Sequence, residues 1–360
     1  MSSFPRMFRG NKDVAAEAVQ ALATYNVPAD TRAALAAYLE RASDRELHRF
    51  NPAYLADQLG LTRRQGLELL WAALQSGLVT LNWEVQCPGC GYEGHAFDSL
   101  STAHSETTCA MCKGVFHAHL DDEIHITFSI SEHLHSPTAQ SDDYAWRAEI
   151  NGRYNPVNSH ELLTLQRYRD MFVNEPLPEG ESFQVKWMAL MFTDLGGSTA
   201  IYARKGDPRA YSLVREHFRL IFEAVNQAGG AVVKTIGDAV MAVFPGGREA
   251  VAAALASQER IERFNNERGL EDDERLRLKV GLHAGPTLAV TLNDRLDYFG
   301  TVVNAAARVQ GQAGHGETVL TRQVLEDAGV REAAPATTAP ETLVLRGLDD
   351  QPFEVVRIRR

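Results

Sequence analysis

Apolar residues recur at helical spacing through the first quarter of the chain. The Ala- and Leu-rich stretch 13–47 predicts two short helices that break near Asn26-Val27-Pro28. Two more helices are expected, one at 51–60, which a glycine ends, and one from an N-cap at Thr62 to about residue 75. A strand at 78–85 follows, so the order is helix, turn, helix and strand.

The pattern changes in the second half, where apolar strands alternate with amphipathic helices from residue 183 onward. An Ala-Pro-Thr stretch at 333–340 predicts a flexible loop before a last pair of strands. This alternation indicates an α+β fold with helices packed on one sheet. The predicted strands are 185–192, 231–236, 239–244, 276–283, 318–321, 343–345 and 353–358, and the predicted helices are 208–227, 248–267 and 301–312.

Composition is that of an ordinary globular protein. The 360 residues are 44% hydrophobic and 23% charged, a length that predicts two or three domains. No apolar run approaches the roughly 20 residues needed to cross a bilayer, and no signal peptide opens the chain, so we expect a cytoplasmic protein without a membrane anchor.

The helix-turn-helix-strand segment resembles a winged helix, which raises the question of nucleic-acid binding. Its second helix carries Arg63, Arg64 and Gln65 only at its start, and the formal net charge of the chain is -11. Phosphate contacts require clustered Lys and Arg, which this chain lacks. Nucleic-acid recognition is therefore disfavoured, and a protein-packing role is preferred.

All four cysteines form two Cys-x-x-Cys pairs, Cys87 with Cys90 and Cys109 with Cys112. Such tight turns let both thiolates of a pair reach one tetrahedral ion, and glycines after each pair (Gly91 and Gly114) are expected to ease the backbone. Four thiolates leave no open position for water. The sequence therefore predicts one structural zinc ion in a zinc ribbon.

Histidines are dense around this ribbon: His95, His104, His117, His119, His125, His133, His135 and His160. A second metal site or a pH sensor is one interpretation of them. In the alternation Ile124-Ile126-Phe128-Ile130, however, His125 falls on the other, wetter face of a predicted strand, which favours an ordinary surface position.

The patterns together predict five segments. We expect a helical segment at 1–47, a winged-helix-like unit at 48–85 and a zinc ribbon with a β extension at 86–135. An irregular, polar segment ending in a Pro- and Glu-rich linker is expected at 136–182, before an α+β domain at 183–360.

Two blocks in that last domain carry its chemistry. Asp194, in Phe-Thr-Asp-Leu-Gly-Gly-Ser-Thr, and Asp238, in Lys-Thr-Ile-Gly-Asp, each follow an apolar strand and stand beside glycine. Strand ends next to tight turns project side chains into open space, so the two carboxylates are expected to converge on a pair of divalent ions. This arrangement indicates nucleotide chemistry.

Together with Gly281-Leu282-His283-Ala284-Gly285 and the segment 297–308, these blocks resemble the catalytic domain of class III adenylyl and guanylyl cyclases. The N-terminal half is similar to a module of unassigned function that precedes bacterial cyclase domains. The resemblance implies a ferredoxin-like sheet with packed helices at 183–360.

The resemblance also assigns residues to the metal and phosphate sites. It implies two Mg2+ or Mn2+ ions per active site, held by Asp194, Asp238 and the backbone carbonyl of Leu195. The triphosphate-binding residues implied are Gly196, Gly197 and Ser198, which open a helix with free N–H groups, and Arg346, which stands where the family usually has Lys.

Asn304 and Arg308 are four residues apart and so share one face of a predicted helix. By resemblance Asn304 orients the ribose and Arg308 stabilises charge on the α-phosphate. Lys234 and Asp297 match the pair that reads the base. A donor beside an acceptor suits adenine and not guanine, so ATP is the expected substrate and cyclic AMP the expected product.

In the family the two metal-binding carboxylates come from one protomer and the base-reading and Asn/Arg pairs from the other. The resemblance therefore implies a homodimer with shared active sites. Two alternatives remain at this point, a guanylyl cyclase and a zinc-ribbon regulatory or scaffold protein with a degenerate cyclase domain. The N-terminal module is expected to be regulatory, with an unidentified protein or ligand as its partner.

Overall fold

The computed structural model describes residues 12–97, 99–138, 141–171, 177–196, 207–271, 274–327, 329–334, 337–348 and 352–359. Gly197 and Ser198, predicted to bind triphosphate, lie outside these ranges. The chain forms two compact units, Met1–Leu162 and Leu163–Arg360. Within the described ranges, every helix is too short or too polar to cross a lipid bilayer.

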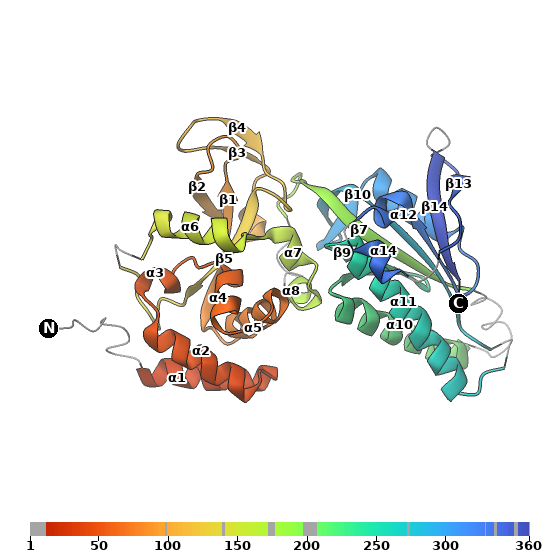
Figure 1. Cartoon of the computed structure of the whole chain (residues 1–360), viewed down its shortest axis with the longest axis horizontal. Coiled ribbons are helices and arrows are strands. Elements are labelled where there is room, and N and C mark those ends of the chain that lie inside the picture. The colour runs from red at the N-terminus through yellow and green to blue at the C-terminus, as the bar shows by residue number, and fades with distance from the viewer. Residues whose placement is uncertain are drawn as a thin grey trace. The chain divides into compact units, whose positions relative to one another are not determined.

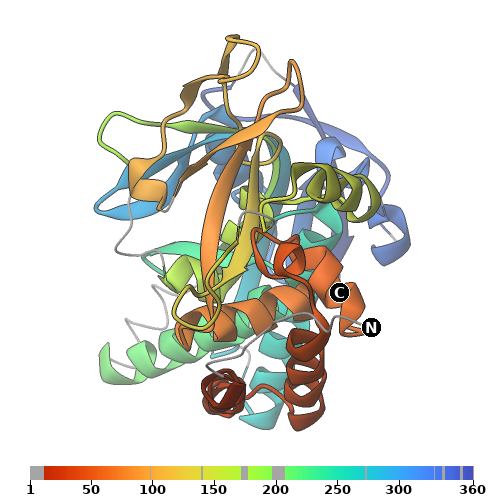
Figure 2. The ribbon, with the colours of Figure 1, turned by 90° about the vertical axis from the view of Figure 1, so that its left-hand side faces the viewer.

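The N-terminal unit begins with helices and continues into small antiparallel sheets, one of four strands in the order β2-β1-β5-β6 and one formed by β3 and β4. Strands β1 and β5 run side by side (Figure 2). The helices are α1 (Lys12–Ala21), η1 (Leu22–Tyr25), α2 (Ala29–Arg41), α3 (Asp44–Leu47), α4 (Pro52–Gln58), α5 (Arg63–Gln75), η2 (Leu100–Thr102), α6 (Tyr144–Tyr154) and α7 (Ser159–Leu163). The strands are β1 (Val79–Gln86), β2 (Glu93–Phe97), β3 (Glu106–Thr108), β4 (Val115–His117), β5 (Ile124–Ile130) and β6 (Val157–Asn158).

Local signals position the predicted helices of this unit. Thr62 caps α5 as expected, and the Gln65 side chain accepts a hydrogen bond from the Thr62 backbone N–H at 2.9 Å. The side chain of Asn51 caps α4, where Pro52 occupies the first turn. The helix, helix and strand order of 52–86 agrees with the pattern, while the winged-helix resemblance stays a prediction.

The segment expected to be irregular contains regular structure instead. Helices α6, α7 and α8 (Gln166–Met171) and strand β6 form within 136–182. These elements bury polar side chains, among them Arg147, His160 and Arg169, some of whose partners come from distant parts of the chain. A polar stretch of sequence predicts exposed, irregular chain, but in this segment several polar side chains are buried within helices. The boundary between the units lies at Leu162, ahead of the expected start at 183.

The prediction for His125 was also wrong. Both faces of β5 are buried, and the His125 ring lies 3.6 Å from the buried carboxylate of Glu93. The second face is polar but dry, since Glu84 accepts hydrogen bonds from Arg49 at 2.7 Å and Thr127 at 2.6 Å. An alternating pattern identifies the two faces of a strand, but it cannot distinguish a wet face from a buried polar one.

The C-terminal unit is built on one mixed sheet, in the order β13-β14-β12-β10-β7-β9-β8, with β11 paired to β10. Among the described strands of this sheet, only β10 and β12 pair in parallel. The strands are β7 (Phe183–Gly196), β8 (Ala231–Ile236), β9 (Ala239–Phe244), β10 (Arg277–Leu292), β11 (Arg295–Phe299), β12 (Glu317–Thr321), β13 (Glu341–Val344) and β14 (Pro352–Arg359). Besides α8, the helices are α10 (Asp207–Ala228), α11 (Gly247–Glu267), α12 (Thr301–Gln310), α13 (Arg322–Leu325) and α14 (Val330–Ala333). The α+β prediction is confirmed.

Alternate residues of the central strands face opposite layers. Leu278, Val280 and Leu282 of β10 join the core with residues of α10 and α11, which lie side by side in Figure 1. The intervening position Gly281 faces α12, where an added Cβ would lie 2.2 Å from the Gln310 backbone nitrogen. Helix α12 therefore occupies the other face of the sheet and rests directly on the strand backbone.

The hairpin of β10 and β11 extends further than the pattern predicted. Strand β10 continues to Leu292, and β11 was not predicted at all. Asn293 and Asp294 form the turn with φ of 51° and 59°. Two such residues at positive φ are typical of a tight hairpin turn, so this dipeptide was a usable signal.

Candidate functional site

The two carboxylates predicted to bind metal lie at the same end of the sheet. Asp194 is on β7, and Asp238 follows Gly237, whose φ of 63° makes the turn between β8 and β9. Thr193 pairs with Val240 across β7 and β9, which brings the two aspartates to neighbouring strand ends. The register alone therefore accounts for their convergence.

The surroundings of these carboxylates suit a cation. Asp238 Oδ2 is buried without a hydrogen-bond partner among the described residues, an arrangement that costs free energy unless something pairs with it. Lys279 Nζ lies 3.9 Å from Asp194 Oδ2, and the Asp194 side chain is 36% exposed. Oxygen ligands of this kind fit Mg2+ or Mn2+.

His217 of α10 lies beneath this end of the sheet. Its Nε2 is 3.0 Å from the Asp238 carbonyl oxygen and its Nδ1 is 2.6 Å from the Val214 carbonyl oxygen. Burial lowers the pKa of His217, although the two carbonyls and the charges of Asp238 and Asp194 oppose that effect. The ring anchors the backbone of Asp238.

The chain that follows Asp194 leads toward the expected phosphate site. The Leu195 side chain is buried in the core shared with α10 and α11, which leaves only its backbone for a ligand. Gly196 ends β7, and a Cβ there would lie 2.5 Å from the His315 ring. Any residue other than glycine would displace His315 at this position.

The predicted base-reading pair is assembled within one chain. Lys234 Nζ on β8 lies 2.5 Å from Asp297 Oδ2 on β11. The Tyr298 backbone N–H donates to the other carboxylate oxygen, Oδ1, at 2.8 Å. The Asp297 side chain is 9% exposed and that of Lys234 is 38% exposed, so the lysine faces the solvent side.

Asn304 and Arg308 share the exposed face of α12, as their spacing predicted. The opposite face, with Ala305 and Val309, packs against the sheet. Gly281 and Gly285 permit this approach, since a Cβ at Gly285 would lie 3.0 Å from Val302. The glycines of the predicted motif thus hold the Asn304/Arg308 helix against β10.

Arg346 is exposed in the turn between β13 and β14, where Gly347 has φ of 79°. Strand β14 runs antiparallel to β12, with Val355 opposite Thr321, so the first residues of β14 lie past the C-terminal end of β12. Because β12 runs parallel to β10, these residues lie toward the C-terminal end of β10. Asp194 instead pairs with Lys279 near the start of β10. Arg346 and Asp194 of one chain therefore lie toward opposite ends of the sheet.

Comparison with known families agrees with this geometry. Residues 181–341 match the family of adenylate and guanylate cyclase catalytic domains. The C-terminal unit contains a class III nucleotide cyclase domain. Members of this class use divalent metals and act as dimers that bind nucleotide. Helix α8 precedes the matched range of the cyclase domain.

Several relatives of the cyclase domain are named adenylate cyclase. That of Anabaena cylindrica is 26% identical over 197 residues, 50% of this chain and 39% of the relative. Adenylate cyclase 2 of Rhizobium meliloti is 31% identical over 146 residues, 38% of this chain and 39% of the relative. The crystal structure of the adenylyl cyclase CyaB from P. aeruginosa is 18% identical, with a TM-score of 0.43, covering 50% of this chain and 96% of that one. The chain spans 39% of the length of both named relatives.

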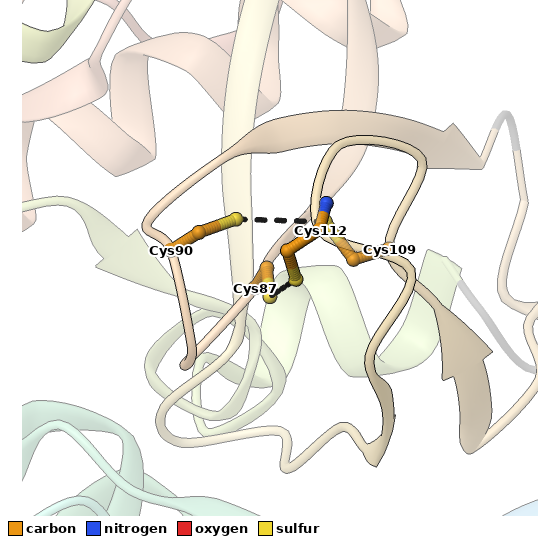
Figure 3. A group of neighbouring side chains, drawn as sticks. All are labelled: Cys87, Cys90, Cys109 and Cys112. Atoms are coloured by element: carbon orange, nitrogen blue, oxygen red, sulfur yellow. Dashed lines mark hydrogen bonds between the residues drawn. The ribbon is translucent and has the colours of Figure 1, made fainter.

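The N-terminal unit matches a family of unknown function (DUF5939) over residues 15–149. Its four cysteines come together between the β1–β2 and β3–β4 hairpins (Figure 3). The Sγ atoms of Cys87 and Cys112 are 3.7 Å apart, and those of Cys90 and Cys109 are 3.6 Å apart. A Zn–S distance of about 2.3 Å implies sulfur separations of about 3.8 Å in a tetrahedron, so the four thiolates fit one zinc ion.

The two cysteine turns differ from the prediction in one respect. Gly91 has φ of 73° as expected, but in the second turn the positive φ of 62° belongs to Lys113 and not to Gly114. The Cys112 backbone N–H donates to Cys109 Sγ at 3.5 Å. This hydrogen bond is the largest of several that lower the pKa of the Cys109 thiol, to about 6, against the opposing effect of burial. Among the described residues, no other such group of metal-ligating side chains lies close together.

Several residues near the cyclase site were not predicted from the sequence. Lys279 alternates with the buried positions of β10, and this alternation indicates a side chain on the face of the sheet away from α10 and α11. No sequence pattern indicated the roles of His217, His315 and Arg169, because each of them contacts a residue far away in sequence.

Proposed function

We propose that this protein is an adenylyl cyclase, which converts ATP to 3',5'-cyclic AMP and pyrophosphate. The observation that carries the proposal is the contact of Lys234 with the buried carboxylate of Asp297. A lysine donor beside a carboxylate acceptor complements N1 and the amino group of adenine. Guanine presents the reverse polarity along this edge and would leave both groups unpaired.

The residues around the scissile bond have separate tasks in this proposal. Divalent ions bound at Asp194 and Asp238 would lower the pKa of the ribose 3'-hydroxyl and screen the phosphates. The ribose 3'-hydroxyl loses its proton to solvent, and its oxygen bonds to the α-phosphorus. The bond between the α-phosphorus and the oxygen that bridges to the β-phosphate breaks, and pyrophosphate leaves with that oxygen. Asn304 orients the ribose while Arg308 pairs with the charge that gathers on the α-phosphate.

Two chains are needed for one complete site in this proposal. Arg346 lies toward the end of the sheet opposite Asp194, so one chain does not offer both to the same triphosphate. A head-to-tail dimer brings the metal-binding end of one protomer to the base-reading pair of its partner. Each dimer then has two equivalent sites.

The test is a turnover assay of the full chain with ATP or GTP and Mn2+, with products separated by chromatography. We expect cyclic AMP and pyrophosphate, with kcat/KM for ATP at least about tenfold above that for GTP. Arg308→Ala is the control, since it should remove the product. Equal or faster turnover of GTP would indicate a guanylyl cyclase, and no product from either nucleotide would favour a scaffold protein.

A further inference from the structure

Helix α8 belongs to neither matched family range, since it lies between residues 149 and 181. It is nevertheless part of the C-terminal unit, which begins at Leu163. The helix packs near β8 and β11, the two strands that carry Lys234 and Asp297. This position places it next to the base-reading pair.

Arg169 ties α8 to β11. Its side chain is buried, and its Nη2 donates a hydrogen bond to the Leu296 carbonyl oxygen. The guanidinium carbon lies 5.5 Å from the centroid of the Tyr298 ring, a distance typical of a cation–π contact. Leu296 and Tyr298 flank Asp297, so Arg169 contacts the backbone before this carboxylate and the aromatic side chain after it.

Gln166 ties the same helix to β8. Its Oε1 accepts a hydrogen bond of 2.7 Å from the Val232 backbone N–H, while its Nε2 donates to Asp170. Strand β8 is at the edge of the sheet, and its pairing with β9 shifts register between Val232 and Lys234. Strand β8 also pairs with β9 and packs against α10. The Gln166 contact adds an anchor to its backbone two residues before Lys234, at the bulge of this edge strand.

The buried guanidinium has a cost that packing alone does not explain. Arg169 Nη1 has no hydrogen-bond partner among the described residues, and a methionine would fill similar space without burying a charge. A pocket of about 530 Å³, lined by residues of α8, α10, β8 and β11, also remains beside the helix. Polar contacts of Arg169 and Gln166 therefore link α8 to the two strands.

We propose that α8 is the element that positions the base-reading pair, with Arg169 and Gln166 as positioning residues for Asp297 and Lys234. The proposal deepens the proposed function, since it assumes that this pair reads adenine. Helix α8 follows the N-terminal unit in the chain and precedes β7. A displacement of α8 changes nucleotide selectivity without touching the metal-binding carboxylates.

The test compares full-length Arg169→Met with Arg167→Met, which removes the same charge from an exposed position of the same helix. The ratio of kcat/KM for ATP to that for GTP should fall about tenfold in Arg169→Met and less than about twofold in the control. An unchanged ratio overturns the proposal. If Arg169→Met does not fold, Gln166→Ala tests the same prediction.

Hydrogen–deuterium exchange separates this proposal from the proposed function. In Arg169→Met and Gln166→Ala the amides of β8 and β11 should exchange faster than in the wild type, and the exchange rates of the amides of β12 and β14 should not change. If the wild type turns over neither nucleotide, the cyclase activity is refuted. Faster exchange of β8 and β11 in the variants would then still support the positioning role of α8. Unchanged exchange in β8 and β11 refutes the positioning role whatever the activity.

Discussion

Glycines in the cyclase domain show most directly how single residues build the site. Gly281 is the point where α12 meets β10, with the Gln310 backbone nitrogen 2.2 Å from where a Cβ would stand. The helix that carries Asn304 and Arg308 can approach only because that side chain is absent. A residue with no functional group thus sets the position of two functional ones.

Gly281→Ala should therefore destabilise the C-terminal unit by about 3 kcal/mol or more, since backbone atoms cannot yield as a side chain can. Turnover should fall about 100-fold in molecules that still fold, because a shift of about 1 Å at Arg308 misplaces it. Urea denaturation and the ATP assay measure both effects. Gly314→Ala is the matched control, since its nearest neighbour is a side-chain oxygen at 3.4 Å. Similar losses in both variants would contradict this explanation.

Residue roles could be predicted where motifs of a known family carry them. Lys234 and Asp297 were paired by the resemblance to cyclases, and the structure brings them to 2.5 Å. Arg169 could not be found in this way because its partner, Leu296, contributes a backbone carbonyl that any residue would offer. When a side chain contacts a backbone atom, the residue type of its partner is not constrained, so the sequence does not indicate the contact.

At the scale of elements, the two cysteine turns link small hairpins that bury little apolar surface by themselves. Strands β3 and β4 pair over only three residues each, Glu106–Thr108 with Val115–His117. Such short pairs are marginal alone, so a zinc ion held by the four cysteines would contribute much of the stability of this region. We propose that the N-terminal unit is regulatory and depends on this zinc site for its folded form.

Cys109→Ser or a strong chelator should remove one zinc ion per chain and lower the melting temperature of the N-terminal unit, with that of the C-terminal unit unchanged. Zinc quantification and differential scanning calorimetry measure these outcomes. The turnover rate should change together with zinc loss if the unit regulates the cyclase domain. Met111→Ser is the control, an exposed position in the same turn. Unchanged turnover after zinc loss would remove the regulatory role.

Most strands and the long helices of the cyclase domain were predicted near their observed bounds, although β11 and the far half of β10 were not, whereas the helices of 136–182 were not predicted. Strands β8 and β9 form at the predicted bounds because apolar runs and the Gly237 turn define them locally. Helices α6 and α8 instead bury Arg147 and Arg169, whose partners include Asp142 and Leu296. A helix that buries charge has no amphipathic pattern to reveal it.

At the scale of the whole molecule, the groups expected at one site are divided between two ends of one sheet. Asp194 lies near the end of β7 and Asp238 directly before the start of β9, at one end of the sheet. Arg346 follows β13 near the opposite end. The register that brings the two aspartates together also separates them from Arg346. A second copy of the chain resolves this separation in the proposed dimer.

Mixing Asp194→Ala chains with Arg308→Ala chains should restore activity that neither variant has alone. With equal amounts and random exchange, about half of the dimers are mixed and each has one intact site of two, so about a quarter of wild-type turnover is expected. The ATP assay before and after mixing measures this. Mixing Asp194→Ala with Asp238→Ala is the control, because both changes fall in the same half of the site. No recovery in the first mixture would exclude shared sites.

The sequence by itself determined the α+β class, the strands of the cyclase domain, the four-cysteine cluster and the residue types at its proposed site, because periodicity and motif spacing are local properties. Tertiary structure decided which faces are dry, where polar side chains find partners, and that α8 belongs with the strands carrying Lys234 and Asp297. These features depend on contacts between residues such as Arg169 and Leu296, more than a hundred positions apart. Only the folded chain brings such residues together.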